Sequence, residues 1–126
     1  MEKIKMTEFR TKDSGKRKSF STGMKRDTEE GKPRMDLCYT SNMPYKEQLL
    51  YRYGMLRARG AEKYCETYDD INCEKASTKE ELARYMSSAA RHFTQWMCGE
   101  EDEDHAAAVL FNIQMAEMVK WKLNHK

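Results

Sequence analysis

The chain has 126 residues, of which 35% are charged and 39% hydrophobic, so it can form one small domain with a modest core but not two independent domains. The net charge is only +2 and no recognised nucleic-acid-binding motif is present, so a nucleic-acid-binding accessory protein is the weakest functional class considered. No stretch approaches the length of a membrane span, which argues against a membrane protein.

The N-terminal part of the chain is basic. Residues 1–34 contain 11 Lys and Arg against 6 Asp and Glu, whereas the remainder contains 12 against 15. Residues 1–19 lack clear periodicity, so we expect a flexible basic arm followed by a single all-α domain over 20–126. The arm either contacts nucleic acid, a phosphate-bearing small molecule or an acidic partner, or it is a solvated tail.

The segment after the arm, residues 20–37, is punctuated by Gly23, Gly31 and Pro33. These residues interrupt helical periodicity. We therefore expect an extended, turn-rich segment that lies over the body of the protein.

The first helix is predicted near residues 44–66. Pro44 suits a first helical turn, and apolar side chains recur at helical spacing after it. Gly54 and Gly60 soften this helix without ending it.

Two further helices are predicted near 78–98 and 103–123. Thr78 and Glu81 have the spacing of a capping box, and Gly99 can end the helix that they begin. An aspartate of "EEDED" can cap the last helix. The fold class is therefore all-α, with three main helices, the last two forming an antiparallel hairpin, and an extended N-terminal arm.

The four cysteines, Cys38, Cys65, Cys73 and Cys98, include no C-x-x-C pair, so a zinc site is not expected from them. The first residues, "MEKIKMTEFRTKD", lack the apolar core of a signal peptide. We therefore expect a cytoplasmic protein with reduced thiols.

Five consecutive acids, Glu100 to Asp104, stand between the last two helices. On a helix, residues four apart share a face, so His92 points along a row toward Glu100, and Asp104 shares a row with Asn112. A hairpin would bring these rows together. Clustered carboxylates on facing helices suggest Mg²⁺, which prefers oxygen ligands. The alternative is that the acids only cap a helix and solvate a turn.

The aromatic side chains near the acids can also have purely structural roles. Spacing alone favours His92 as a hydrogen-bonded core histidine over a residue that contacts a ligand. His105 either polarises a ligand or is exposed. Trp96 and Phe111 are interpreted as core residues rather than groups that stack on a base.

Basic side chains suggest a phosphate-binding half of the site. Arg26, Lys32, Arg34 and Lys63 are candidates for phosphate oxygens, because Arg offers a planar fork and Lys a point charge. Neither a G-x-x-x-x-G-K-[ST] loop nor a G-x-G-x-x-G motif is present, which argues against P-loop and dinucleotide-binding folds.

Three stretches carry a family resemblance. "FSTGMKRDTEEGKPRMDL", "RGAEKY" and "RHFTQWMCGEEDEDHAAAVLFN" resemble, in the same order, motifs of dATP/dGTP diphosphohydrolase-like proteins, which phages frequently encode and which are related to all-α MazG-type enzymes. The resemblance covers roughly residues 20–120. It implies a MazG-like helical bundle that assembles as a dimer or tetramer, located in the host cytoplasm if phage-encoded. It also implies Mg²⁺-dependent cleavage of a purine deoxynucleoside triphosphate to monophosphate and pyrophosphate.

The resemblance also implies roles for individual residues. The implied catalytic residues are Glu100, Asp104 and His105, and the implied Mg²⁺ ligands are Glu100, Glu103 and Asp104. The implied substrate-binding residues are Arg26, Lys32, Arg34, Lys63, His92 and Asn112.

The sequence departs from its relatives in two places. "KYCETYDDIN" lacks the Asn-Trp pair that commonly follows this motif, and Ala107 and Ala108 stand where MazG-type enzymes carry a carboxylate. Glu62 and Glu66 could supply a missing pair of carboxylates or be surface residues. An alternative function is therefore a non-catalytic protein of the same fold that binds and sequesters a nucleotide.

Overall fold

The computed structural model describes residues 13–64 and 70–126. Contacts divide the chain into two compact units that meet in sequence between Met35 and Asp36. Most of the predicted flexible arm, residues 1–12, lies outside the described residues, as do Cys65, Glu66 and the predicted end of the first helix.

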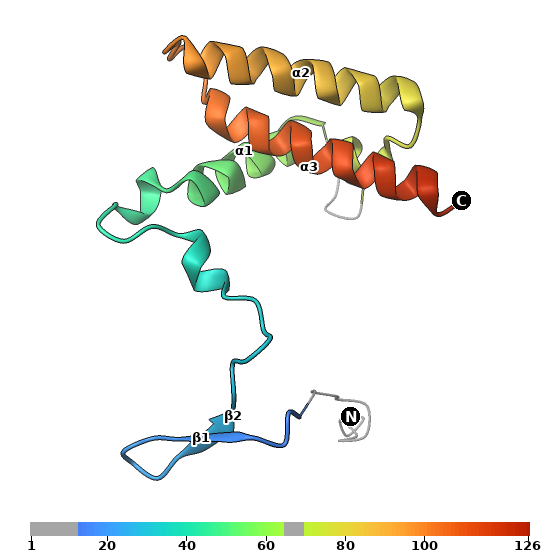
Figure 1. The fold of residues 1–126 in the computed structure, drawn as a ribbon. Helices are drawn as coiled ribbons and strands as arrows, with labels where there is room; N and C mark the ends of the chain where they lie inside the picture. Colours follow the sequence, from blue (N-terminus) through green and yellow to red (C-terminus); the bar gives the residue numbers. More distant parts are fainter. Residues whose placement is uncertain (1–12, 65–69) are drawn as a thin grey trace, which may run out of the picture. The chain divides into compact units, whose positions relative to one another are not determined.

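The first unit contains a short antiparallel hairpin formed by β1 (Arg17–Ser19) and β2 (Lys25–Asp27) (Figure 1). Lys18 lies opposite Arg26 in its register. Gly23 adopts a φ of 89° in the connecting turn. The sequence predicted only extended, turn-rich chain here. The predicted boundary between arm and body, at residues 19 and 20, falls inside this hairpin, and a single domain over 20–126 stays a prediction.

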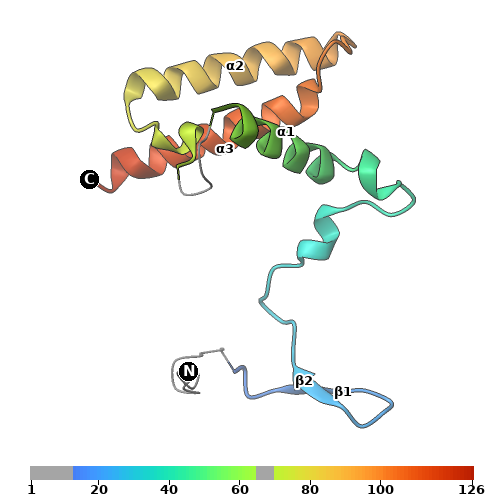
Figure 2. The same ribbon diagram turned by 180° about the vertical axis from the view of Figure 1, so that it is seen from behind.

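The second unit is helical, as predicted. It contains α1 (Leu49–Tyr64), α2 (Lys79–Met97) and α3 (His105–Asn124), together with the short helices η3 (Tyr45–Glu47) and η4 (Asn72–Lys75). The short helix η2 (Met35–Cys38) spans the division between the two units. Both ribbon views show α2 and α3 side by side as an antiparallel hairpin, with α1 packed against α3 (Figures 1 and 2). The all-α prediction is confirmed.

Helix α3 is central to this unit. It carries most of the buried side chains, namely His105, Ala107, Asn112, Met115, Ala116 and Val119. Tyr85 of α2 meets Phe111 of α3 edge to face, with ring centroids 6.2 Å apart. The small Ala107 is fully buried, which allows close packing at the start of α3. The core is therefore a stripe along one helix and not a thick interior.

The first helix begins later than predicted. Tyr45–Glu47 forms η3, and Gln48 has an extended ψ of 142°, so α1 starts at Leu49 and not near Pro44. The buried Gln48 amide donates to Thr40 O at 2.7 Å and to Met43 O at 3.0 Å. These bonds hold Gln48 against the preceding loop and explain the delayed start.

The boundaries of α2 follow the predicted signals. The Thr78 side chain accepts from the Glu81 N–H at 3.1 Å, and the Glu81 carboxylate accepts from the Thr78 N–H at 3.2 Å, which completes a capping box. At the other end, Gly99 adopts a φ of 76°. Its N–H donates to Trp96 O, and the Glu100 N–H donates to Gln95 O, forming a Schellman motif.

One interpretation of α2 is wrong. Trp96 is 54% exposed and is not a core residue, because it lies in the last turn of α2 beside the chain reversal. Phe111 is half-buried.

Among the described residues, no helix combines the length and apolarity needed to cross a membrane.

We expect Thr78→Ala to lower the free energy of unfolding by about 1 kcal/mol, because the Glu81 N–H loses its acceptor. Thermal melting followed by circular dichroism measures the change. Thr94→Ala is the matched control, since Thr94 lies within α2 and its hydroxyl donates only to the preceding turn at Ala90 O. Unchanged melting of Thr78→Ala would contradict the capping role.

Candidate functional site

The chain reversal between α2 and α3 gathers the acidic run and two histidines into one corner. The Schellman motif at Gly99 turns the chain back, and Asp104 caps α3 by accepting from the Ala107 N–H at 3.1 Å. The acids lie between two fixed helix ends, and their side chains point to different partners.

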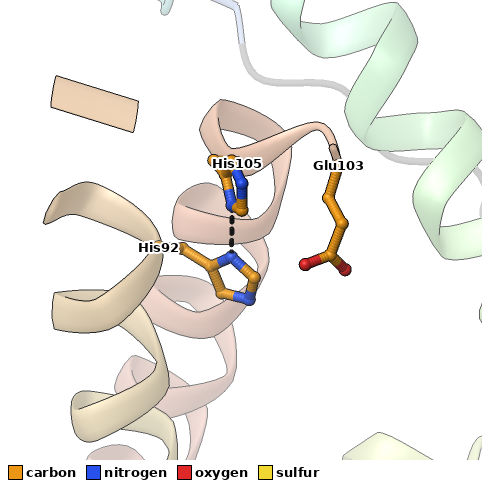
Figure 3. A group of neighbouring side chains, drawn as sticks. All are labelled: His92, Glu103 and His105. Carbon is orange, nitrogen blue, oxygen red and sulfur yellow. Dashed lines mark hydrogen bonds between the residues drawn. The ribbon is translucent and has the colours of Figure 1, made fainter. Parts of the chain in front are cut away.

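A buried pair of imidazoles joins the two helices at this corner. His92 Nδ1 lies 2.8 Å from His105 Nδ1, and the two residues are only 8% and 2% exposed (Figure 3). His105 Nε2 lies 2.7 Å from Asp102 Oδ1. With both rings neutral, His105 donates to Asp102 and accepts the His92 Nδ1–H. This places the lone pair of His92 Nε2 toward Arg91 Nη2, 3.4 Å away.

Burial and charge set the ionisation of this group. Burial, followed by the nearby Arg91 charge, lowers the pKa of His92 and favours its neutral form. The hydrogen bond from His105 lowers the pKa of Asp102, so this carboxyl is an acceptor at neutral pH. The pattern fixes one set of tautomers across the corner.

Asp104 forms a two-point ion pair with Arg52 of α1. Arg52 Nε donates to Asp104 Oδ2 at 2.8 Å and Arg52 Nη2 donates to Oδ1 at 3.2 Å. Burial pushes the pKa of Asp104 upward, but the hydrogen bonds from Arg52 and the Ala107 N–H outweigh it and lower that pKa overall. The carboxylate therefore connects α1 to the start of α3.

Glu100 and Glu103 bring the remaining predicted ligands to the same place. Ligand atoms of His92, Glu103 and His105 lie within 4.8 Å of one another, as do those of Glu100, Asp102 and His105. A surface pocket of about 290 Å³ opens beside them. Its lining includes Arg52, Trp96, Glu100, Glu103, Asp104 and His105.

Two predicted contacts take other forms in the structure. Asn112 is buried and its side-chain amide donates to Ala108 O of its own helix at 2.8 Å, so the row from Asp104 does not present it at the pocket. Lys63 lies near the end of α1, with its ammonium 5.1 Å from the centroid of the Tyr64 ring. Their roles in substrate binding stay predictions.

The other predicted phosphate-binding residues belong to the first unit. Arg26 is exposed on β2, Lys32 lies 3.4 Å from Asp27, and Arg34 lies 3.7 Å from Glu29. Lys32 and Arg34 are thus paired with acids of the same unit, and the role of all three residues toward phosphate stays a prediction.

Sequence reasoning missed Arg52 and Asp102. Arg52 pairs with an acid 52 residues away, and a single sequence carries no signal for that contact. In the sequence, Asp102 stands out only as one of five consecutive acids. Its position three residues before His105 was the available signal, because such spacing at a helix start allows contact.

The comparisons with known proteins give one family. A family model described as dATP/dGTP diphosphohydrolase, N-terminal, matches residues 22–125, which include the acidic corner and all three helices. Neither the curated proteins nor the solved structures contain a match to this chain.

We expect Asp104→Asn to lower the free energy of unfolding by no more than about 1 kcal/mol at pH 7, because asparagine still caps α3 and the ion pair is partly exposed. The folded-state pKa of Asp104 is lowered, so its contribution is present above the unfolded pKa of about 3.9 and is lost as pH falls through the folded value.

Urea unfolding of the wild type and Asp104→Asn across this pH range measures the difference. Glu101→Gln is the control, since it removes a charge from an exposed side chain of the same turn. A difference that stays constant from pH 7 to below the folded pKa would contradict the assigned ion pair.

Proposed function

This chain belongs to the dATP/dGTP diphosphohydrolase, N-terminal family, and from this premise we propose that it cleaves a purine deoxynucleoside triphosphate to a monophosphate and pyrophosphate with Mg²⁺. The observation that carries the proposal is the pocket at the α2–α3 corner, where carboxylates and a guanidinium line one surface inside the matched region.

The charge of the pocket favours a metal-bound nucleotide over a free one. Glu100, Glu103 and Asp104 would repel a bare triphosphate, and Arg52 offsets only part of that charge. A divalent cation held by these acids would offset much of the remaining negative charge and would allow phosphate oxygens to approach. Arg52 can then donate to phosphate, because its guanidinium is a planar fork suited to such oxygens.

The donor set fits Mg²⁺ in part. Glu100 and Glu103 offer exposed carboxylate oxygens, the ligand type that Mg²⁺ prefers. Asp104 also offers oxygens, but it would have to exchange its bonds with Arg52 for the ion. A bound Mg²⁺ would supply charge neutralisation and an activated water.

The histidines have a different task in this proposal. Both ring nitrogens of His105 are in hydrogen bonds, with Asp102 and His92. His105 therefore acts as a positioning residue that fixes the acidic turn, and His92 holds His105 in place. Glu100 is exposed, whereas His105 is buried, and Glu100 is the residue proposed to accept a proton from water.

A second candidate function is nucleotide binding without cleavage. The contact that favours it is the Arg52–Asp104 pair, which engages one of the three proposed metal ligands. Ala107 and Ala108 add no carboxylate at the start of α3. A protein of this kind would hold the nucleotide intact at the same pocket.

The exposed apolar side chains of α2 support assembly as a homo-oligomer. Met86, Phe93, Trp96 and Met97 are all exposed in the single chain. Such a patch is commonly covered by a partner, and a second copy is the simplest one. Sedimentation at micromolar concentration is expected to give the mass of a dimer or tetramer, and a monomer mass would contradict this part of the proposal.

The catalytic proposal is tested by incubating the chain with each deoxynucleoside triphosphate and Mg²⁺ and separating the products. We expect monophosphate and pyrophosphate, with a purine preferred. Glu100→Gln and Glu103→Gln should each slow cleavage by about a hundredfold or more, because each removes a negatively charged ligand of the proposed Mg²⁺ ion.

Glu117→Gln is the matched control, since Glu117 is an exposed glutamate on α3 that does not line the pocket. Intact nucleotide that stays tightly bound would support sequestration and overturn cleavage. Equal rates of cleavage for all three variants and the wild type would contradict the assignment of the catalytic site to the acidic corner.

A further inference from the structure

The buried pair of imidazoles, His92 and His105, is not needed merely to pack α2 against α3. Two imidazole nitrogens, His92 Nδ1 and His105 Nδ1, lie 2.8 Å apart, beside the Glu103 carboxylate (Figure 3). A leucine or methionine pair would join two helices without placing polar groups in the interior. The choice of two histidines at this point therefore calls for a chemical explanation.

We propose that His92, His105 and Glu103 bind a divalent transition-metal ion of the Mn²⁺ or Co²⁺ class. The three residues come from the end of α2, the start of α3 and the turn between them, and their ligand atoms lie within 4.8 Å of one another. Imidazole suits transition metals, whereas Mg²⁺ prefers oxygen donors.

The nitrogen separation is compatible with an octahedral ion. With metal–nitrogen distances of about 2.0–2.1 Å, a nitrogen separation of 2.8 Å corresponds to an angle of about 85° at the metal. Neighbouring ligands of an octahedral ion make an angle near this value, whereas a tetrahedral ion needs a wider one. In the hydrogen bond both nitrogens point toward each other, so each ring has to turn by roughly 45° to direct its lone pair at a common centre.

The surroundings of His105 match those of a metal-ligating histidine. Such a histidine commonly donates its other ring N–H to a carboxylate, which fixes the tautomer and makes the ligand nitrogen more basic. Here His105 Nε2 bonds Asp102 Oδ1 at 2.7 Å, which directs Nδ1 toward His92. Asp102 is therefore a positioning residue for the proposed centre.

The protons balance without a change in net ring charge. The His92 ring gives up its Nδ1 hydrogen to make that nitrogen a ligand and carries a hydrogen on Nε2 instead. That hydrogen points toward Arg91 Nη2, 3.4 Å away, so the Arg91 side chain has to move. Arg91 is exposed and can do so.

This inference deepens the proposed function, because Glu103 also belongs to the proposed Mg²⁺ ligands, but its test needs no nucleotide. Chelator-treated protein is titrated with Co²⁺ in buffer that contains Mg²⁺, and binding is followed by the visible absorption of Co²⁺ and by calorimetry. We expect one Co²⁺ ion per chain, with nitrogen ligands raising its absorption above that of hydrated Co²⁺.

The variants separate this centre from chance binding. His92→Gln and Glu103→Gln should lose the Co²⁺ absorption. Asp102→Asn keeps all three ligands and should weaken binding about 10–100-fold. His125→Gln is the matched control, because His125 is exposed at the end of α3 and is the remaining histidine of the chain. It should bind Co²⁺ as the wild type does.

Two results would overturn the inference: no Co²⁺ binding by the wild type, or equal binding by His92→Gln, Glu103→Gln and the wild type. Circular dichroism checks the fold of each variant, and Asp102→Asn decides the matter if a histidine variant unfolds. Cleavage of a nucleotide in Mg²⁺ alone, without Co²⁺ binding, would sink this centre and leave the proposed function standing. Co²⁺ binding without cleavage of any nucleotide would support this centre and contradict the proposed cleavage.

Discussion

The hydrogen bond between His92 and His105 is the contact on which the arrangement of the corner depends. It joins the last turns of α2 to the first turn of α3 in a buried setting, where an unmade bond would leave two polar rings unpaired. Because each ring can accept or donate, the carboxylate of Asp102 decides which one does. The same hydrogen bonds therefore fix the tautomers of the two histidines and the path of the acidic turn.

Hydrogen bonds to two of the acids explain how five adjacent acids are accommodated at this corner. Asp102 accepts from His105, and Asp104 accepts from Arg52 and from the free N–H of Ala107 at the start of α3. These donors offset part of the repulsion among neighbouring carboxylates. Glu100 and Glu103 remain near the pocket and the histidines, where a cation would offset the rest. Structural roles for two acids thus coexist with a proposed binding role for two others.

Local signals in the sequence predicted the helix ends well. Thr78 with Glu81, Gly99 and Asp104 each act on backbone groups within a few residues, so their effect is visible in the sequence. Longer contacts escaped prediction. Gln48 delays α1 by bonding a loop eight residues earlier, and Arg52 reaches Asp104 across 52 residues.

The apolar spacing along α2 does not show which of its side chains are buried, since Phe93 and Trp96 are both exposed. Trp96 lies in the last turn of α2, beside the acidic turn and in the lining of the pocket. The hairpin of β1 and β2 escaped for another reason: strands of three residues are too short to show alternation. For the candidate site, the sequence drew attention to the acidic segment, whereas the pairing of its side chains depends on tertiary contacts that the sequence does not show.

The most direct test of this account is a crystal structure of the chain with Mn²⁺ and a non-hydrolysable purine deoxynucleoside triphosphate, with anomalous diffraction recorded at the manganese edge. The account predicts an anomalous peak at the α2–α3 corner, in contact with Glu100 or Glu103, and phosphate oxygens beside Arg52. A bound triphosphate whose metal lies away from the turn between Glu100 and His105 would contradict it.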